Sequence, residues 1–204
     1  MFLGVNRAPK PYQVVRHLLK CVEDNIEPPK GIYDWLNNNA QASDLAQLKD
    51  KPCLRLEGEY LRPDQVFWGQ HPFGRFRVAL GTEFQKYQML LKALGIKQTP
   101  DYRDAIEVLK EVASEVGNSL LKPEDKEVVL QCWVMLSEAL QRGELDAGSI
   151  QAELHDTKCV PNLQEQLYPL SWMFFEDRPG LAEKFGDWLS KNTIPRPERA
   201  WLAM

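Results

Sequence analysis

The sequence has few of the features from which a catalytic or membrane function is usually inferred. Only 12 of its 204 residues are glycine, and neither GxxxxGK[ST] nor GxGxxG occurs. Glycine-rich turns that present backbone amides to nucleotide phosphates are therefore missing. Its four cysteines form no CxxC pair, and no apolar run approaches the roughly 20 residues that a membrane span requires. These absences argue against nucleotide binding by those motifs, a small disulfide scaffold and a transmembrane helix.

Basic residues are also fewer than acidic ones, with 25 Lys and Arg against 29 Asp and Glu and a formal net charge of -4. Domains that bind the phosphate backbone are usually basic, so nucleic acid is not the expected partner. The opening "MFLGVNRAPK" has no charged segment followed by the apolar run of a signal peptide. We therefore expect a cytoplasmic globular protein whose cysteines are free, buried thiols.

What the sequence does contain is an internal repeat. When the chain is moved by 106 positions, residues 43–63 meet residues 149–169 without a gap. Identical pairs include Ser43 with Ser149, Ala46 with Ala152, Leu48 with Leu154, Asp50 with Asp156, Cys53 with Cys159, Leu61 with Leu167 and Pro63 with Pro169. Upstream, "LGVNRAP" matches "LGIKQTP" at a shift of 91. We predict two tandem units, 1–93 and 94–204, in a chain cut at repeat boundaries from a longer protein.

The first part of each unit is predicted to be helical. In the second unit, apolar residues recur with a period of 3.6, and Thr99 and Pro100 are interpreted as the N-cap and first residue of a helix that Gly117 ends. Pro123 is predicted to begin a second helix, and a short third helix follows it.

After these helices the period changes from 3.6 to 2. Residues 53–61 alternate around Glu57 and Gly58, which predicts a β-hairpin with a tight turn. The counterpart "CVPNLQEQLYPL" is a poorer strand because Pro161 removes a hydrogen-bond donor, which favours an edge position. The predicted fold is thus α+β and predominantly helical, with each unit a helix pair, a short helix, a small β-hairpin and a following helix.

The cysteines suggest two kinds of reactive site, a metal site with histidine and a cysteine nucleophile. His17 and Cys21 stand four residues apart, as do His155 and Cys159, a spacing that suits metal ligands on a helix. Neither histidine recurs in the other unit, so a surface histidine beside a core cysteine is favoured. Cys53 and Cys159 do recur, and a recurring position is more often a packing residue than a nucleophile. We predict no catalytic residue, no cofactor and no metal ligand, and hence no enzyme.

Nucleic-acid binding was weighed at two places. "GQHPFGRFR", residues 69–77, sets aromatic side chains beside arginines, as single-stranded nucleic-acid surfaces do. Its counterpart "FEDRPGLAEKF" does not share this composition, so a loop that packs Phe73 and Phe76 inward is favoured. Three helices followed by a hairpin is also the order of a winged helix, and a tandem winged-helix-like module is the alternative function. However, the third-helix candidates "SDLAQLKD" and "SIQAELHD" have almost no basic residues.

Two segments resemble a known family. "KPCLRLEGEYLRPDQVFW" and "TKCVPNLQEQLYPLSWMFFEDRPGLAEKF" are similar to recurring segments of sacsin and NO VEIN-type proteins, which follow a GHKL ATPase domain related to the ninety-kilodalton heat-shock chaperone. The second copy lacks a glycine in its turn, and the first lacks the proline after its cysteine. The matching positions are Cys53, Gly58, Leu61, Pro63, Phe67 and Trp68 in the first copy and Cys159, Pro161, Leu167, Pro169, Met173 and Phe174 in the second. These residues, without Gly58 and Pro161, are the predicted repeat signature.

The resemblance implies a helical, non-catalytic structural and protein-interaction segment of a large chaperone-like or scaffold protein. Any ATPase activity would reside in a domain outside this chain. The implied partners are neighbouring domains of the parent chain or another protein, and no membrane.

Overall fold

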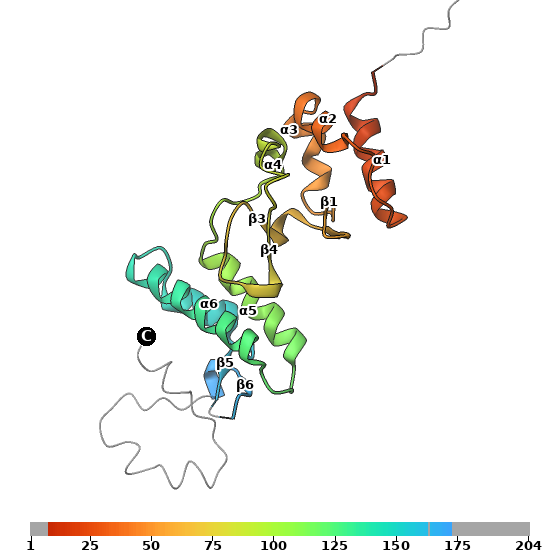
Figure 1. The fold of residues 1–204 in the computed structure, drawn as a ribbon. Helices are drawn as coiled ribbons and strands as arrows, with labels where there is room; N and C mark the ends of the chain where they lie inside the picture. The colour runs from red at the N-terminus through yellow and green to blue at the C-terminus, as the bar shows by residue number, and fades with distance from the viewer. Residues whose placement is uncertain (1–7, 163, 173–204) are drawn as a thin grey trace, which may run out of the picture. The chain divides into compact units, whose positions relative to one another are not determined.

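The computed structural model describes residues 8–162 and 164–172, which fall into two compact units (Figure 1). The first unit comprises the described residues up to 71 together with 77–99, and the second comprises 72–76 and the described residues from 100 on. The fold is α+β and predominantly helical, as predicted, and each small sheet has two strands. The tandem repeat with its boundary at residues 93 and 94 stays a prediction.

The first unit begins with three helices. These are α1 (Pro11–Glu23), α2 (Ile32–Asn39) and the four-residue α3 (Ala42–Leu45), which continues into a 3₁₀ turn, Ala46–Leu48. Proline is the first residue of α1, where its missing N–H costs nothing. The apolar residues of α1 recur every three positions, and this spacing turns one face of the helix into the core.

A β-hairpin follows, formed by β1 (Leu54–Leu56) and β2 (Glu59–Leu61), with Leu54 opposite Leu61. Glu57 and Gly58 both have positive φ angles, 50° and 91°, as a two-residue type I′ turn requires. The predicted turn is confirmed, and glycine at its second position explains why the backbone adopts this angle without strain.

The segment after the hairpin is extended before it becomes helical. Pro63–Gln65 forms a 3₁₀ turn, and β3 (Val66–Phe67) then pairs in parallel with β4 (Val78–Ala79). The helix predicted after this apolar cluster is α4, Gln88–Leu94, which begins well beyond it.

One hydrophobic core holds the first unit together, and it draws on every helix and on the hairpin. Its buried members are Val15, Leu18, Ile32, Leu36, Leu45, Leu48, Cys53, Leu54, Leu56, Val66, Leu80, Phe84, Tyr87, Leu90, Leu91, Leu94 and Ile96.

The second unit is built on two long helices that lie side by side, α5 (Tyr102–Val116) and α6 (Pro123–Gln141), followed by α7 (Ala147–Leu154) (Figure 1). The predicted helix start at Thr99 and Pro100 is wrong. Asp101 is the N-cap, because its carboxylate accepts hydrogen bonds from two backbone N–H groups of the first turn. The predicted helix end at Gly117 and the start of α6 at Pro123 are confirmed.

A second hairpin follows α7, formed by β5 (Val160–Pro161) and β6 (Leu167–Tyr168). Both strands are edge strands, which agrees with the proline in β5. Its register differs from that of the first hairpin. The Cys53 N–H donates to the carbonyl of Leu61, eight residues on, whereas the Cys159 N–H donates to the carbonyl of Tyr168, nine residues on. The ungapped sequence match therefore differs from the backbone pairing by one residue.

Candidate functional site

Most residues of the predicted repeat signature lie in the interior. In the first hairpin and the segment after it, Cys53, Pro63 and Phe67 are buried, and Leu61 and Trp68 are half-buried. In the second, Cys159, Leu167 and Pro169 are buried, while Met173 and Phe174 lie outside the described residues. The described signature residues therefore serve the packing of the two hairpins.

All four cysteines are free and buried, as expected, and two of them have perturbed thiols. Burial raises the pKa of the Cys53 and Cys159 thiols to about 12. The thiolate is the nucleophilic form of cysteine, so at neutral pH both thiols stay protonated and inert.

We predict that Cys53 and Cys159 will not react with Ellman's reagent in the folded protein at pH 8, because their thiolates are scarce and shielded. The absorbance of the released thiol should rise only after denaturant is added, and labelled peptides identified by mass spectrometry should then include both cysteines. Rapid labelling of either cysteine without denaturant would contradict this burial.

An aromatic side chain on a helix donates a hydrogen bond to the backbone of the cysteine that begins each hairpin. The Tyr33 hydroxyl, on α2, donates to the Cys53 carbonyl at 2.9 Å and accepts from the Arg55 N–H at 3.0 Å. The Trp133 Nε1, on α6, donates to the Cys159 carbonyl at 2.9 Å. Sequence reasoning missed both anchors, because neither aromatic residue lies near its cysteine in the chain.

We predict that Tyr33→Phe will lower the free energy of unfolding by about 1–3 kcal/mol, since it leaves the Cys53 carbonyl and the Arg55 N–H without this partner. Urea denaturation followed by circular dichroism would measure the loss. The matched control is Tyr12→Phe, at a side chain that is 57% exposed, for which we expect a change within about 0.5 kcal/mol. Equal effects at the two positions would show that the hydrogen bonds of Tyr33 do not stabilise the hairpin.

Residues 72–76 belong to the second unit, and we call them the PFGRF segment after their sequence, Pro72–Phe76. The segment makes both apolar and charged contacts. Phe73 is fully buried, and Phe76 is half-buried beneath the Arg75 guanidinium, which lies 4.5 Å from the ring centre. The prediction that this loop packs its aromatic residues inward is confirmed for Phe73.

Arg75 makes three charged contacts. Its Nε and one terminal nitrogen donate to the two carboxylate oxygens of Asp125 at 3.0 and 3.2 Å, and its other terminal nitrogen donates to Glu115 at 2.6 Å. The Asp125 side chain is only 2% exposed, whereas Arg75 is 45% exposed. Because Asp125 and Glu115 accept its hydrogen bonds, the pKa of Arg75 is raised further above its usual value. The guanidinium thus neutralises a carboxylate that water does not reach.

The backbone of the segment also approaches α6 closely. Gly74 has a positive φ angle of 49°, and a Cβ at this position would lie 3.0 Å from the Val128 Cγ2. Glycine is therefore favoured by the backbone angle, and a larger residue would also have to displace the Val128 side chain by a few tenths of an ångström.

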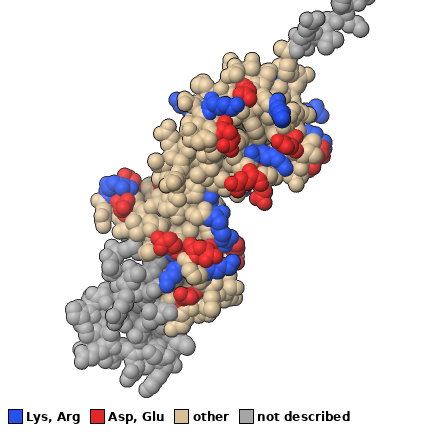
Figure 2. Space-filling view, viewed as in Figure 1, with Lys and Arg blue, Asp and Glu red and all other residues tan. Residues whose placement is uncertain are grey.

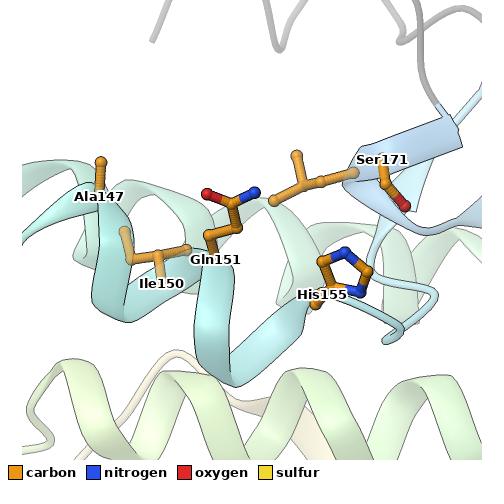
Figure 3. A pocket seen from close by; sticks show the side chains of 6 residues that line it. Ala147, Ile150, Gln151, His155 and Ser171 are labelled. Carbon is orange, nitrogen blue, oxygen red and sulfur yellow. The ribbon is translucent and has the colours of Figure 1, made fainter.

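A pocket of about 320 Å³ lies beside α7 (Figure 3). Its described lining is Ala147, Ile150, Gln151, His155, Leu170 and Ser171. The His155 Nδ1 lies 2.8 Å from the carboxylate of Asp156, but that carboxylate is 95% exposed. In the described part of the chain, no hydrogen bond joins His155 to Ser171, so these residues do not form a bonded nucleophile–base pair.

A second pocket, of about 360 Å³, lies between the start of α5 and α7, and several of its lining residues are acidic. Glu107 and Glu153 both pair with Lys110, Glu144 pairs with Arg142, and Asp146 accepts two hydrogen bonds from Ser149. These acids are therefore engaged with neighbours in the same unit, but Lys110 and Arg142 balance only part of their negative charge.

His17 and His155 are exposed, whereas Cys21 and Cys159 are buried. Residues 8–162 and 164–172 hold no group of three or more residues suited to a metal ion. Acidic and basic side chains are interspersed over the described part of the face in Figure 2. None of the described helices has both the length and the apolar character needed to cross a membrane.

Comparison with known proteins found no match: no protein-family model, no curated protein and no solved structure matches the chain.

Proposed function

We propose that this chain is a non-catalytic structural and protein-interaction segment of a large, sacsin-like chaperone or scaffold protein of the cytoplasm. The observation that supports the proposal best is the use made of the two recurring cysteines. Each is buried at the start of a hairpin, and each has its carbonyl bound by an aromatic side chain from the second helix of its unit. The two recurring cysteines therefore help to anchor two hairpins, which differ in register by one residue.

The alternative, a tandem winged-helix-like nucleic-acid-binding module, gains no support from the third helices. A recognition helix enters the major groove and needs basic residues near the phosphates. Helix α3 has four residues and α7 has eight, and neither contains Lys or Arg.

The proposal is tested with the purified chain in two assays. We expect no ATP turnover above the buffer rate, and no retardation of duplex DNA or single-stranded RNA in gels at 50–150 mM salt (concentrations that span roughly the physiological range). Tight binding that weakens as salt rises would favour the nucleic-acid module instead.

The family assignment has a separate test, which is to read the parent gene upstream of this segment. A GHKL ATP-binding domain there would support the sacsin-like proposal. A complete upstream sequence without one would remove the main reason for naming that family, although the interaction role would remain open to the binding assays.

A further inference from the structure

The PFGRF segment is unusual because its chain neighbours and its packing partners belong to different units. Residues up to 71 and from 77 to 99 belong to the first unit, yet the five residues between them group with the second. The segment and the helices α5 and α6, which it contacts, therefore lie within one unit.

The contact has the chemistry of a receptor that holds a short peptide. An aromatic side chain, Phe73, is completely removed from water, which is the usual role of an anchor residue. Near it in the chain, Arg75 forms a bidentate ion pair with Asp125, and this geometry discriminates guanidinium from ammonium. Gly74 between them lets the backbone lie against Val128.

The residues that contact the Arg75 guanidinium form a site suited to a cation. The Asp125 carboxylate is 2% exposed and comes from the first turn of α6, and Glu115 on α5 supplies a second, half-exposed carboxylate. A buried carboxylate is stable only when it is paired and hydrogen-bonded, so a site that contains Asp125 favours a bound segment with an arginine. A site that bound its segment by apolar packing alone would need no buried charge.

We propose that the second unit is a peptide-binding module whose ligand is a Phe-Gly-Arg segment in a 3₁₀ turn, and that the chain's own residues 72–76 occupy the site as an intramolecular ligand. This inference rests on the interaction role proposed above and names its ligand. The recognised features are an aromatic anchor, a glycine and a guanidinium, in that order. When the internal segment is displaced, a peptide with the same three features takes its place.

The test uses the full chain with residues 72–76 replaced by Gly-Ser-Gly-Ser-Gly. A fluorescein-labelled peptide, GQHPFGRFRV (residues 69–78), is titrated with this variant and with the unmodified chain, and binding is followed by fluorescence anisotropy. We expect saturable binding to the variant and at least tenfold weaker binding to the unmodified chain, whose site is already filled. Equal binding to both chains, or none to a folded variant, would overturn the proposal.

Changes in the peptide test the chemistry without altering the fold of the receptor. Peptides with Phe73→Ala, Gly74→Ala or Arg75→Lys should each bind at least tenfold more weakly, and a scrambled peptide should not bind. If the Arg75→Lys and scrambled peptides bound as well as the original, non-specific adhesion of an apolar peptide would explain the signal, and the proposal would be wrong.

A change in the receptor gives the matching control. In the chain with the replaced segment, Asp125→Asn should weaken binding at least tenfold, whereas Glu124→Gln, at the exposed neighbouring carboxylate, should leave it unchanged. If circular dichroism shows that the replaced chain does not fold, the same titrations are made with the full-length Phe73→Ala chain. Its internal segment lacks the aromatic anchor, so the added peptide should bind to it, and failure to bind would overturn the proposal. Because these assays do not involve ATP or nucleic acid, their failure is distinct from failure of the proposed function.

Discussion

Phe73→Ala is expected to lower the free energy of unfolding by about 3–5 kcal/mol, the largest effect that we predict for a single substitution in this protein. The side chain is fully buried, so its removal loses apolar contacts and leaves a cavity that the neighbouring helices fill only in part. Urea denaturation monitored by tryptophan fluorescence would measure the loss, because Trp133 lies on α6 in the same unit.

Two other apolar side chains provide controls for that measurement. Met89 is 69% exposed, so Met89→Ala should change the stability by no more than about 0.5 kcal/mol. Phe76 is half-buried, and Phe76→Ala should fall between the two. A loss below about 1 kcal/mol for Phe73→Ala, within the range of ordinary substitutions, would mean that residue 73 does not anchor the segment in solution.

Arg75→Ala is expected to lower the free energy of unfolding by about 1–3 kcal/mol. Removing one partner of a fully buried ion pair costs about 3–5 kcal/mol, because the other charge is left buried and unpaired. Arg75 is 45% exposed, so water reaches the site of the missing guanidinium and screens part of that cost.

A double-mutant cycle separates the ion pair from the loss of packing. Arg75→Ala, Asp125→Ala and the double variant are compared by urea denaturation, and we expect the double variant to be more stable than the sum of the single losses predicts, by about 1 kcal/mol or more. Lys20→Ala serves as the control, because both its ion pairs are exposed and should contribute little. Strict additivity between positions 75 and 125 would show that the two groups do not interact in solution.

Local features of the fold were predictable wherever a short stretch of chain specifies its own geometry. The Glu57-Gly58 turn, the end of α5 at Gly117 and the start of α6 at Pro123 all depend on backbone angles or donors that are set by one or two residues. The start of α5 shows the limit of this reasoning. Thr99 and Asp101 are both good N-caps, and only the hydrogen bonds of the folded helix identify Asp101.

The hairpin registers could not be predicted from the repeat. The sequence match aligns Leu61 with Leu167. In the backbone, however, the Cys53 N–H bonds to Leu61, whereas the Cys159 N–H bonds to Tyr168, one residue beyond Leu167. Register depends on the turn and on the core that each strand faces, and an ungapped sequence match contains neither.

By itself, the sequence determined the class of the protein: a predominantly helical α+β chain with two small hairpins and buried cysteines. Periodicity and turn chemistry act over a few residues, so they can be read without the fold. Only the tertiary structure decided which distant groups meet, namely Tyr33 with Cys53, Trp133 with Cys159 and, above all, Arg75 with Asp125. These contacts join residues 20 to 50 positions apart. Burial gives such pairs their strength, and burial is a property of the folded chain.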